Sequence, residues 1–275
     1  MSSETPWIPV GDLAKGFEHD SYSLSPTNAL AGKTLSLSYE DGRVVEHRFT
    51  SESALTWTVT EGAEQGRTAT EQYRAIEIRE GIYFVDLVKN GERATSLSIV
   101  LDLCRGICTA VIGRLPDEAR ARTDLLSRRA SSGVDLTPVE AAFLSGAIDA
   151  IFTDQTPRHE PTADLVGRRV QYIYSPTEAY EHIYLNQQFY TWHCLRGVEK
   201  GLADTDRCHY YKLGDELYLF VWREKLIPTL GVVVVDYQSM RSNGKIFGYE
   251  GEDFGTLSNF PVGSAARLQN VTVHP

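Results

Sequence analysis

The chain repeats its own sequence at an offset of 135 residues, and this repeat limits its possible folds more than any other feature. Leu30-Ala-Gly-Lys33 matches Leu165-Val-Gly-Arg168. The further matches are Tyr39 with Tyr174, Glu46-His47 with Glu181-His182, Phe49 with Tyr184, Thr56-Trp57 with Thr191-Trp192, Gly62 and Gly66 with Gly197 and Gly201, Thr70 with Thr205, and Tyr83 with Tyr218. Two copies are too few to bury the core of a solenoid, so we interpret them as tandem domains or a fused dimer.

Both copies have the pattern of short β-strands. In the second copy, runs rich in β-branched and aromatic residues follow one another, separated by Ser-Pro, Asn-Gln and Gly-Asp breaks. These runs are Val170 to Tyr174, Tyr180 to Leu185, Phe189 to Leu195, Cys208 to Leu213 and Glu216 to Trp222. Such closely spaced strands predict an antiparallel meander, which leaves no unpaired edge once it closes into a barrel. We therefore expect a mainly β protein with two tandem antiparallel barrels, at residues 28–116 and 164–275.

The segments outside the two copies have other patterns. Residues 117–163 are expected to form a short helical connector that packs against the first barrel. Leu115 to Arg129 carries alternating charges, and Thr137-Pro138 predicts the start of a second helix, with the threonine as N-cap and an apolar body over 141–152. The N-terminal arm, residues 1–27, is polar, and Ser25-Pro26 favours an extended course.

Charge and composition exclude several classes of partner. Lys and Arg number 27 against 37 Asp and Glu, so the net charge is −10, and neither a nucleic acid nor a membrane is an expected partner. Residues 1–16 lack the pattern of a signal peptide, and no apolar run approaches the length of a spanning helix. Four cysteines do not make a disulfide scaffold here, so we expect a reduced, cytoplasmic protein, as a monomer (a pseudo-dimer) or a homodimer.

Alternation along the strands of the second copy places polar and aromatic side chains together. Side chains two residues apart lie on the same face of a strand. The sets that share a face are Tyr172 and Tyr174; Tyr180, His182 and Tyr184; and Tyr218, Phe220, Trp222 and Glu224. Facing inward, they would enclose phenols, an imidazole, an indole and a carboxylate, which suits a flat aromatic or conjugated ligand. Tyrosine is also common in strands, where it only packs.

These sets predict roles for individual residues. Tyr172 and Tyr174 are predicted to hold an oxygen of the substrate, Glu224 to move a proton and His182 to act as a second base or to orient the substrate. The predicted substrate-binding residues are Tyr184, Trp192, Trp222 and Tyr218. Trp192 also recurs as Trp57, which favours a place in the core at the barrel floor. We expect no metal and no cofactor.

The two copies differ in their aromatic content. The second copy holds ten of the fourteen tyrosines, whereas the equivalent faces of the first are mostly aliphatic. This asymmetry predicts that the site, and the larger and more polar lumen, lie in the second barrel. The first barrel would be mainly scaffold, with Tyr39, His47 and Arg67 as counterparts of the site residues.

The opening segment Val10-Gly-Asp-Leu-Ala14, followed by Leu30-Ala-Gly-Lys-Thr34 and by the tandem duplication, resembles the molybdenum cofactor biosynthesis protein F (MoaF) family. The resemblance covers essentially the whole chain. It implies a lipocalin-like (calycin) fold for each barrel. The family's name also suggests an accessory role in molybdenum cofactor biosynthesis.

Each repeat is also similar to bacterial phenolic acid decarboxylase, itself a small lipocalin-like barrel. In that family two tyrosines, an arginine and a glutamate line the lumen, where they hold a carboxylate and assist proton transfer. Tyr172-Ile-Tyr174 matches the tyrosine pair, and Trp222-Arg-Glu224 matches the strand with the glutamate. The second copy has Leu202 where the family has its arginine.

The first copy holds the complementary part of that set. Gly62-Ala-Glu-Gln-Gly66-Arg67 keeps the arginine, and Tyr39 matches the second tyrosine. Leu37 replaces the first tyrosine, and Lys89 replaces the glutamate. Three functions follow as alternatives: a cofactor-independent and metal-independent lyase, decarboxylase or isomerase acting on a small aromatic or conjugated substrate; a non-catalytic carrier or sensor of the lipocalin type; or an accessory protein of molybdenum cofactor biosynthesis.

Overall fold

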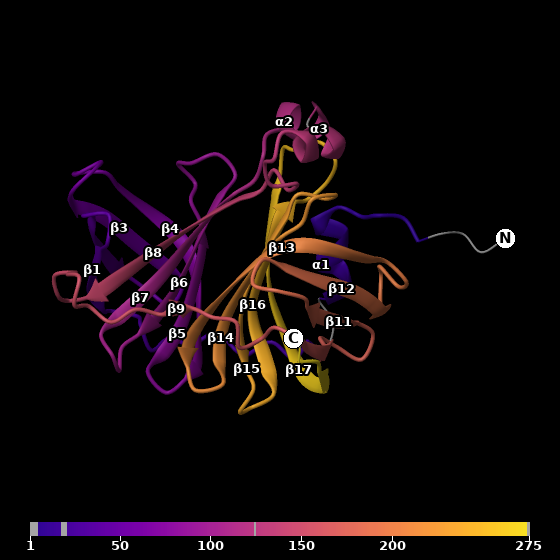
Figure 1. Ribbon diagram of the computed structural model, residues 1–275. Helices are drawn as coiled ribbons and strands as arrows, with labels where there is room; N and C mark the ends of the chain where they lie inside the picture. Colours follow the sequence, from indigo (N-terminus) through magenta and orange to yellow (C-terminus); the bar gives the residue numbers. More distant parts are fainter. Residues whose placement is uncertain (1–4, 18–20, 124, 274–275) are drawn as a thin grey trace. The chain divides into compact units, whose positions relative to one another are not determined.

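The structure is a computed structural model that describes residues 5–17, 21–123 and 125–273. The chain divides into two compact units, and each is built around one antiparallel barrel (Figure 1). The unit of the first barrel comprises residues 24–114 and 141–159, and the remaining described residues form the unit of the second barrel. The expected fold class, two tandem antiparallel barrels with few helices, is confirmed.

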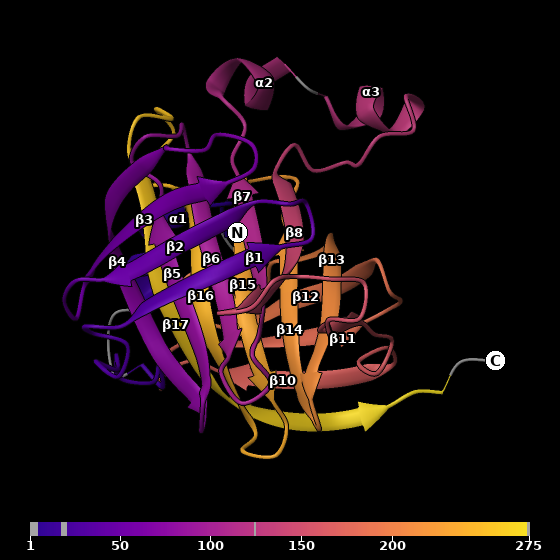
Figure 2. The same cartoon turned by 90° about the vertical axis from the view of Figure 1, so that its left-hand side faces the viewer.

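Eight strands form the first barrel in chain order (Figure 2). They are β1 (Thr34–Tyr39), β2 (Val44–Phe49), β3 (Ala54–Glu61), β4 (Thr68–Arg79), β5 (Ile82–Val88), β6 (Thr95–Asp102), β7 (Ile107–Arg114) and β8 (Glu140–Ile148). Antiparallel pairing of β1 with β8, in which Leu37 lies opposite Ile148, closes the ring. The buried cluster inside is largely aliphatic, with Leu37, Leu55 and Ala75 among its members.

The second barrel also closes on eight strands. They are β10 (Arg168–Ile173), β11 (Ala179–Tyr184), β12 (Phe189–Arg196), β13 (Ala203–Gly214), β14 (Leu217–Arg223), β15 (Thr229–Asp236), β16 (Arg241–Tyr249) and β17 (Leu257–Val271). The pairing of β10 with β17 and that of β12 with β13 complete the ring. A short strand, β9 (Glu160–Pro161), pairs with β13 from outside the ring.

The sequence repeat corresponds to a repeated strand register. Thr56 lies opposite Thr70 in the first barrel, and Thr191 lies opposite Thr205 in the second. The hydroxyl oxygens of each pair are 2.7 Å apart and hydrogen-bonded. The recurring threonines are thus cross-strand partners, which stabilise the same pairing in both barrels.

The predicted helix over 138–152 is wrong, because Glu140–Ile148 is the strand β8. The hydroxyl of Thr137 does accept a hydrogen bond from the Val139 backbone N–H, at 3.1 Å, but this closes a local turn rather than a helix start. A seven-stranded first barrel would leave β1 with an unpaired edge, and β8 covers that edge. Tertiary pairing therefore overrides the helical preference of the local sequence.

The rest of the connector packs against the second barrel, not the first as expected. It carries two short helices, α2 (Glu118–Thr123) and α3 (Leu126–Ser131), in the same unit as that barrel. Arg223 on β14 forms an ion pair of 2.8 Å with Asp135 of the connector. The hydroxyl of Thr137 donates a hydrogen bond of 2.8 Å to the backbone carbonyl of Glu224.

The N-terminal arm contains a helix, α1 (Val10–Phe17), which lies on β16 and β17 of the second barrel. Its apolar residues Val10, Leu13 and Phe17 are spaced to share one face, and all three are buried. Gly11 lies so close to the sheet that a Cβ atom there would be 2.3 Å from the backbone carbonyl oxygen of Glu250. This contact fixes the depth at which the helix is seated.

A buried carboxyl lies under the same helix. A Cβ at Gly16 of α1 would be 3.1 Å from Oε1 of Glu178, which shows how closely the helix packs on this side chain. Oε1 accepts a hydrogen bond of 3.2 Å from the Val198 backbone N–H, whereas Oε2 has no partner within the part of the chain that the structure describes. Burial raises the pKa of Glu178 to about 7, against the lowering effect of the Val198 hydrogen bond.

Replacing Gly11 should unseat α1. In an exposed helix Gly→Ala stabilises by up to about 1 kcal/mol, but here the added methyl group collides with the backbone of Glu250. We expect Gly11→Ala to lower the free energy of unfolding by about 1–3 kcal/mol, measured by urea denaturation. Lys15→Ala, on the exposed face of the same helix, is the control and should change little. A Gly11→Ala protein as stable as the wild type would contradict this seating.

Glu178 should make stability depend on pH. Because its pKa in the folded protein is raised above the ordinary value of 4.5 to about 7, the folded state holds the proton more tightly than the unfolded state. This contribution to stability is complete below pH 4.5 and is lost as the pH rises to about 7. Glu178→Gln should remove a difference on the order of 2–3 kcal/mol between these two pH values. The exposed Glu61→Gln should leave the pH profile of unfolding unchanged, and identical profiles for both variants would exclude this role.

Candidate functional site

The second barrel contains a pocket of about 350 Å³, counting the part open to solvent. Residues from α1 and from several strands line it: Leu13, Phe17, Tyr174, Tyr180, His182, Tyr190, Trp192, Glu199, Trp222, Glu224 and Ile246. The wall therefore consists of aromatic rings with two carboxyl groups. No lysine or arginine is found in this lining, as far as the structure describes the chain.

The pocket brings together five of the eight site residues predicted from the sequence of the second copy. They are Tyr174, His182, Trp192, Trp222 and Glu224. The alternation of strand side chains explains this, since Tyr180 and His182 both point inward from β11, and Tyr190 and Trp192 from β12. Antiparallel pairing then places His182 directly opposite Trp192.

The other three predicted residues lie elsewhere. The phenol oxygen of Tyr172 is 2.7 Å from that of Tyr184 and 3.1 Å from that of Tyr237, so these hydroxyls satisfy one another within the core. Tyr218 donates a hydrogen bond of 3.3 Å to Asp164. Tyr172 and Tyr174 share a face, but inward positions two residues apart are separated by about 6.6 Å along a strand. Only Tyr174 therefore reaches the pocket.

Glu224 is placed by its neighbour two residues earlier. Nε1 of Trp222 donates a hydrogen bond of 2.9 Å to Oε1 of Glu224. Burial of the carboxyl, followed by repulsion from Asp206 and Glu199, raises the pKa of Glu224 well above its ordinary value. The carboxyl therefore holds a proton at a pH at which an exposed glutamate is ionised.

His182 lies in the pocket as a neutral ring. Its ring centroid is 4.7 Å from that of Tyr172 and 5.2 Å from that of Tyr190. Burial lowers the pKa of His182 to about 3, and Nδ1 is buried without a hydrogen-bond partner among the described residues. A buried polar atom that lacks a partner is available to a ligand or a water molecule.

The prediction from sequence did not include the acidic neighbours of the pocket. Tyr180 donates a hydrogen bond of 3.0 Å to Glu199, and burial raises the pKa of this carboxyl. Nε1 of Trp192 donates one of 3.0 Å to Asp206, whose pKa burial raises to about 6. The recurrence of Gly-x-Glu-x-Gly around Glu64 and Glu199 was the signal that could have pointed to the first of these residues.

The first barrel contains a wider pocket, of about 530 Å³ including the part open to solvent. Its lining residues are Tyr39, Arg43, Val45, His47, Trp57, Val59, Glu64, Lys89, Leu97, Ala110, Ile112 and Leu144. The expectation that the larger and more polar lumen lies in the second barrel is therefore wrong. Small side chains explain the difference, because Ala75 and Val85 stand where the second barrel has Tyr210 and Phe220.

Two of the three predicted counterparts line this first pocket, namely Tyr39 and His47. Nδ1 of His47 donates a hydrogen bond of 3.1 Å to the Val45 carbonyl, and burial lowers the pKa of the ring to about 4. Arg67 lies beside the pocket and forms ion pairs with Glu64, at 2.6 Å, and Glu92, at 2.9 Å.

The two pockets are equivalent at the offset of the repeat. His47 lies opposite Trp57 in the first barrel, as His182 lies opposite Trp192 in the second. Tyr39 and Tyr174 line their pockets at matching positions, as do Glu64 and Glu199. At one matching position the charge is reversed, because Lys89 lines the first pocket and Glu224 the second. The residues that recur in the sequence thus recur as pocket walls.

The described residues include neither a metal-binding cluster nor a membrane-spanning helix. Within residues 5–17, 21–123 and 125–273, no group of three or more His, Cys, Asp or Glu side chains is arranged to hold a metal ion. Over the same residues, no helix is long and apolar enough to cross a membrane.

Comparison with known proteins identifies the family. The MoaF N-terminal domain matches residues 5–117, and the MoaF C-terminal domain matches residues 159–272. Protein MoaF from Klebsiella aerogenes is 45% identical over 274 residues, which are 100% of this chain and 99% of that protein. A putative beta-lactamase from Burkholderia vietnamiensis covers 46% of this chain and 100% of its own, but its 15% identity and TM-score of 0.33 support no conclusion. With both domains matched and a relative this similar along its full length, the chain belongs to the MoaF family.

Proposed function

We propose that the second barrel binds a small aromatic or conjugated molecule that donates a hydrogen bond to Glu224. One observation carries this proposal, namely the pair of carboxyl groups, Glu224 and Glu199, set among aromatic rings in a pocket whose described lining holds no cation. Carboxyl groups in such a wall recognise a hydroxyl or an ammonium group, because either can donate a hydrogen bond to them.

The aromatic rings of the pocket wall would contact the flat part of the ligand. Trp222 stacks on Phe220 with centroids 5.2 Å apart, and Tyr190 lies edge-on to Phe220 at 4.9 Å. These rings hold one another in place, so they form a rigid apolar surface before any ligand arrives. A flat ligand gains offset or edge-to-face contacts on such a surface, worth about 0.5–1.5 kcal/mol per pair beyond the burial of area.

The charge of the wall selects against an anion. Asp206 and Glu199 already raise the pKa of Glu224 by repulsion, and a carboxylate ligand would add a further negative charge to this group. The position of the arginine in phenolic acid decarboxylase is Leu202 here, so no guanidinium offsets that charge. The ligand of the second barrel is therefore neutral or positively charged.

A matched set of probes tests this site: benzyl alcohol, benzylamine and benzoate, which share one ring and differ in charge. We expect benzyl alcohol and benzylamine to shift the indole N–H signals of Trp192 and Trp222 in a proton–nitrogen correlation spectrum, and benzoate to leave them in place. Benzylamine should bind more tightly as the pH rises, because Glu224 must ionise to pair with it.

Glu224→Gln should abolish this pH dependence and weaken benzylamine by about tenfold, the effect of about 1.4 kcal/mol. Glu216→Gln, which removes a carboxylate outside the pocket, is the matched control. Shifts with benzoate equal to those with benzylamine would contradict the proposal.

A second candidate function is proton transfer within the bound molecule, and the pairing of Glu224 with His182 favours it. Burial raises the pKa of Glu224 well above its ordinary value and so favours its protonated form, while His182 is a neutral base in the same pocket. In an isomerisation, Glu224 would give its proton to one atom of a conjugated substrate and His182 would take a proton from another. Two groups whose pKa values are shifted apart are typical of acid–base catalysis. Because the described wall offers a carboxylate no cation, isomerisation is a better fit than decarboxylation.

Glu224→Gln also tests catalysis, because it keeps the shape of the side chain and removes its proton chemistry. We expect turnover of a conjugated enone or phenol, followed by absorbance, to fall by about 10²–10⁴. His182→Gln should lower turnover as well, whereas benzyl alcohol binding should persist in both variants. Turnover that survives Glu224→Gln, or no turnover across a panel of enones and phenols, would leave the second barrel as a carrier or sensor.

A further inference from the structure

The first barrel carries an equivalent pocket with basic side chains at two positions that are acidic in the second copy. Besides Lys89 in place of Glu224, Arg43 stands at the position of Glu178. Both cations line the first pocket, together with Trp57 and the neutral ring of His47. Tyr39, His47, Trp57 and Glu64 are thus retained in the wall, and two positions that are acidic in the second copy are basic in the first.

We propose that the first barrel is a second ligand site, which takes a small aromatic anion such as a carboxylate. Its ring would lie on Trp57 and its carboxylate between Lys89 and Arg43. The two barrels of this chain would then bind ligands of different charge in pockets that arose by duplication of one ancestral pocket. This site is separate from the one proposed in the second barrel.

Lys89 and Trp57 form the first part of the site. Nζ of Lys89 lies 4.6 Å from the centroid of the Trp57 ring, within the range of a cation–π contact. The side chain of Lys89 is only 16% exposed, so water screens its charge less than at the surface. Lys89 is also ion-paired with Glu92, and Arg43 with Asp41 at 2.7 Å, so an incoming anion would share these partly desolvated cations with carboxylates of the protein.

Trp57 also offers a hydrogen-bond donor. Trp57 is 5% exposed, and its Nε1 is buried without a partner among the described residues. In the second barrel the equivalent Trp192 donates to Asp206. The residue equivalent to Asp206 is Glu71, whose carboxylate instead accepts hydrogen bonds from the side chain of Asn90, at 2.6 Å, and from its backbone N–H. The indole N–H of the first barrel is thus left for another acceptor.

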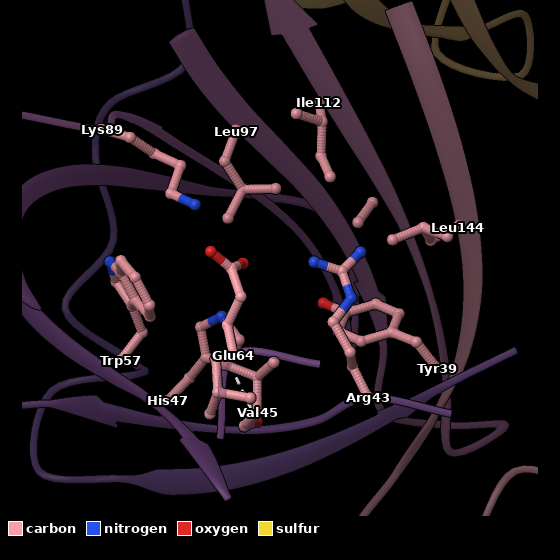
Figure 3. Close-up of a pocket in the computed structure, with 12 residues that line it drawn as sticks. Tyr39, Arg43, Val45, His47, Trp57, Glu64, Lys89, Leu97, Ile112 and Leu144 are labelled. Atoms are coloured by element: carbon pink, nitrogen blue, oxygen red, sulfur yellow. Dashed lines mark hydrogen bonds between the residues drawn. The ribbon is translucent and has the colours of Figure 1, made fainter. Parts of the chain in front are cut away.

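Glu64 is a carboxylate of the protein itself in the first pocket. It lines the pocket, and its charge acts on Arg43. In the view of Figure 3 its carboxylate is drawn between the amine of Lys89 and the guanidinium of Arg43. Its ion pair is with Arg67, at 2.6 Å, and its side chain lines the same pocket as the two cations.

This carboxylate is placed so that a ligand can displace it. The side chain of Glu64 is 51% exposed, and its ion pair with Arg67 also lies near the surface. The equivalent Glu199 is 8% exposed and is held by the hydroxyl of Tyr180, but position 45, which matches Tyr180, is a valine. Glu64 can therefore leave the pocket toward solvent and expose Lys89 and Arg43 to an incoming anion.

The indole N–H signal of Trp57 provides a readout that belongs to the first barrel alone. The chain has four tryptophans, so Trp57→Phe assigns this signal by its disappearance. The full-length protein is titrated with benzoate, benzyl alcohol and benzylamine. We expect benzoate to shift the Trp57 signal at millimolar concentrations, and benzylamine to leave it unchanged. The signals of Trp192 and Trp222 report the second barrel in the same spectra, so failure at one site is distinguished from failure at the other.

Variants of the charged residues test the mechanism. Glu64→Gln removes the competing carboxylate and should tighten benzoate binding, whereas Lys89→Gln and Arg43→Gln should each weaken it by about tenfold. Glu46→Gln and Lys33→Gln, which change charges of the same barrel outside the pocket, are the matched controls and should have no effect. Unchanged backbone amide signals of residues 34–114 in the ligand-free spectrum verify that the first barrel of each variant is folded.

Three results would overturn the proposal. They are the absence of any benzoate shift at Trp57, binding of benzylamine as tight as that of benzoate, and benzoate binding that is the same in Lys89→Gln and Arg43→Gln as in the wild type. If Glu64→Gln weakens benzoate, displacement is wrong and the proposal falls with it. If one cation variant fails to fold, the other variant and Glu64→Gln still decide the outcome.

Discussion

The interior of an eight-stranded barrel has room only for side chains or one small ligand, so the size of each inward residue decides where space remains. In the second barrel Tyr210 and Phe220 stack with centroids 5.6 Å apart and fill the core beside the hydrogen-bonded phenols of Tyr172 and Tyr184. The first barrel has smaller residues at several of these positions and keeps the wider pocket. The tyrosines of the second copy thus mainly fill the core, and of those that the structure describes only Tyr174, Tyr180 and Tyr190 line the pocket.

Duplication of a closed barrel repeats the register as well as the strands. Because His47 faces Trp57 and His182 faces Trp192, each pocket begins with the same imidazole and indole. A substitution at one inward position can then change the charge of a pocket while the strands and their pairing stay the same. Lys89 and Glu224 occupy such a position, and in a partly desolvated site a reversal of charge outweighs small differences in shape. Divergence of ligand class after duplication therefore requires very few substitutions.

The sequence patterns predicted the strands and which side chains face the barrel interior. They did not predict how deep a side chain lies in the barrel, or which strands pair to close the ring. The recurring residues and the run of short strands predicted the two barrels, and alternation predicted that Tyr174, His182 and Glu224 share one lumen. Alternation tells which face of a strand a residue takes but not how deep it lies in the barrel. Tyr172, which was predicted with Tyr174, is bonded to Tyr184 and is not part of the pocket lining. The strand β8 is required by the closure of the ring, and no local signal in 140–148 expresses that requirement. Likewise, the many tyrosines of the second copy suggested a polar lumen, whereas their rings fill most of the interior of that barrel.

The helix α1 has no counterpart in the repeat. The wall of the second pocket therefore differs from that of the first in containing residues of a helix, as well as in charge. Leu13 and Phe17 of this helix form part of the wall, and the helix packs closely on Glu178. A rise in pH through the raised pKa of Glu178 places a charge beneath this helix and weakens its seating. The same rise favours the ionised form of Glu224, which holds a hydrogen-bond donor more strongly. If the second barrel binds a ligand as proposed, a rise in pH is thus expected both to loosen α1 through Glu178 and to strengthen the hydrogen bond that Glu224 accepts.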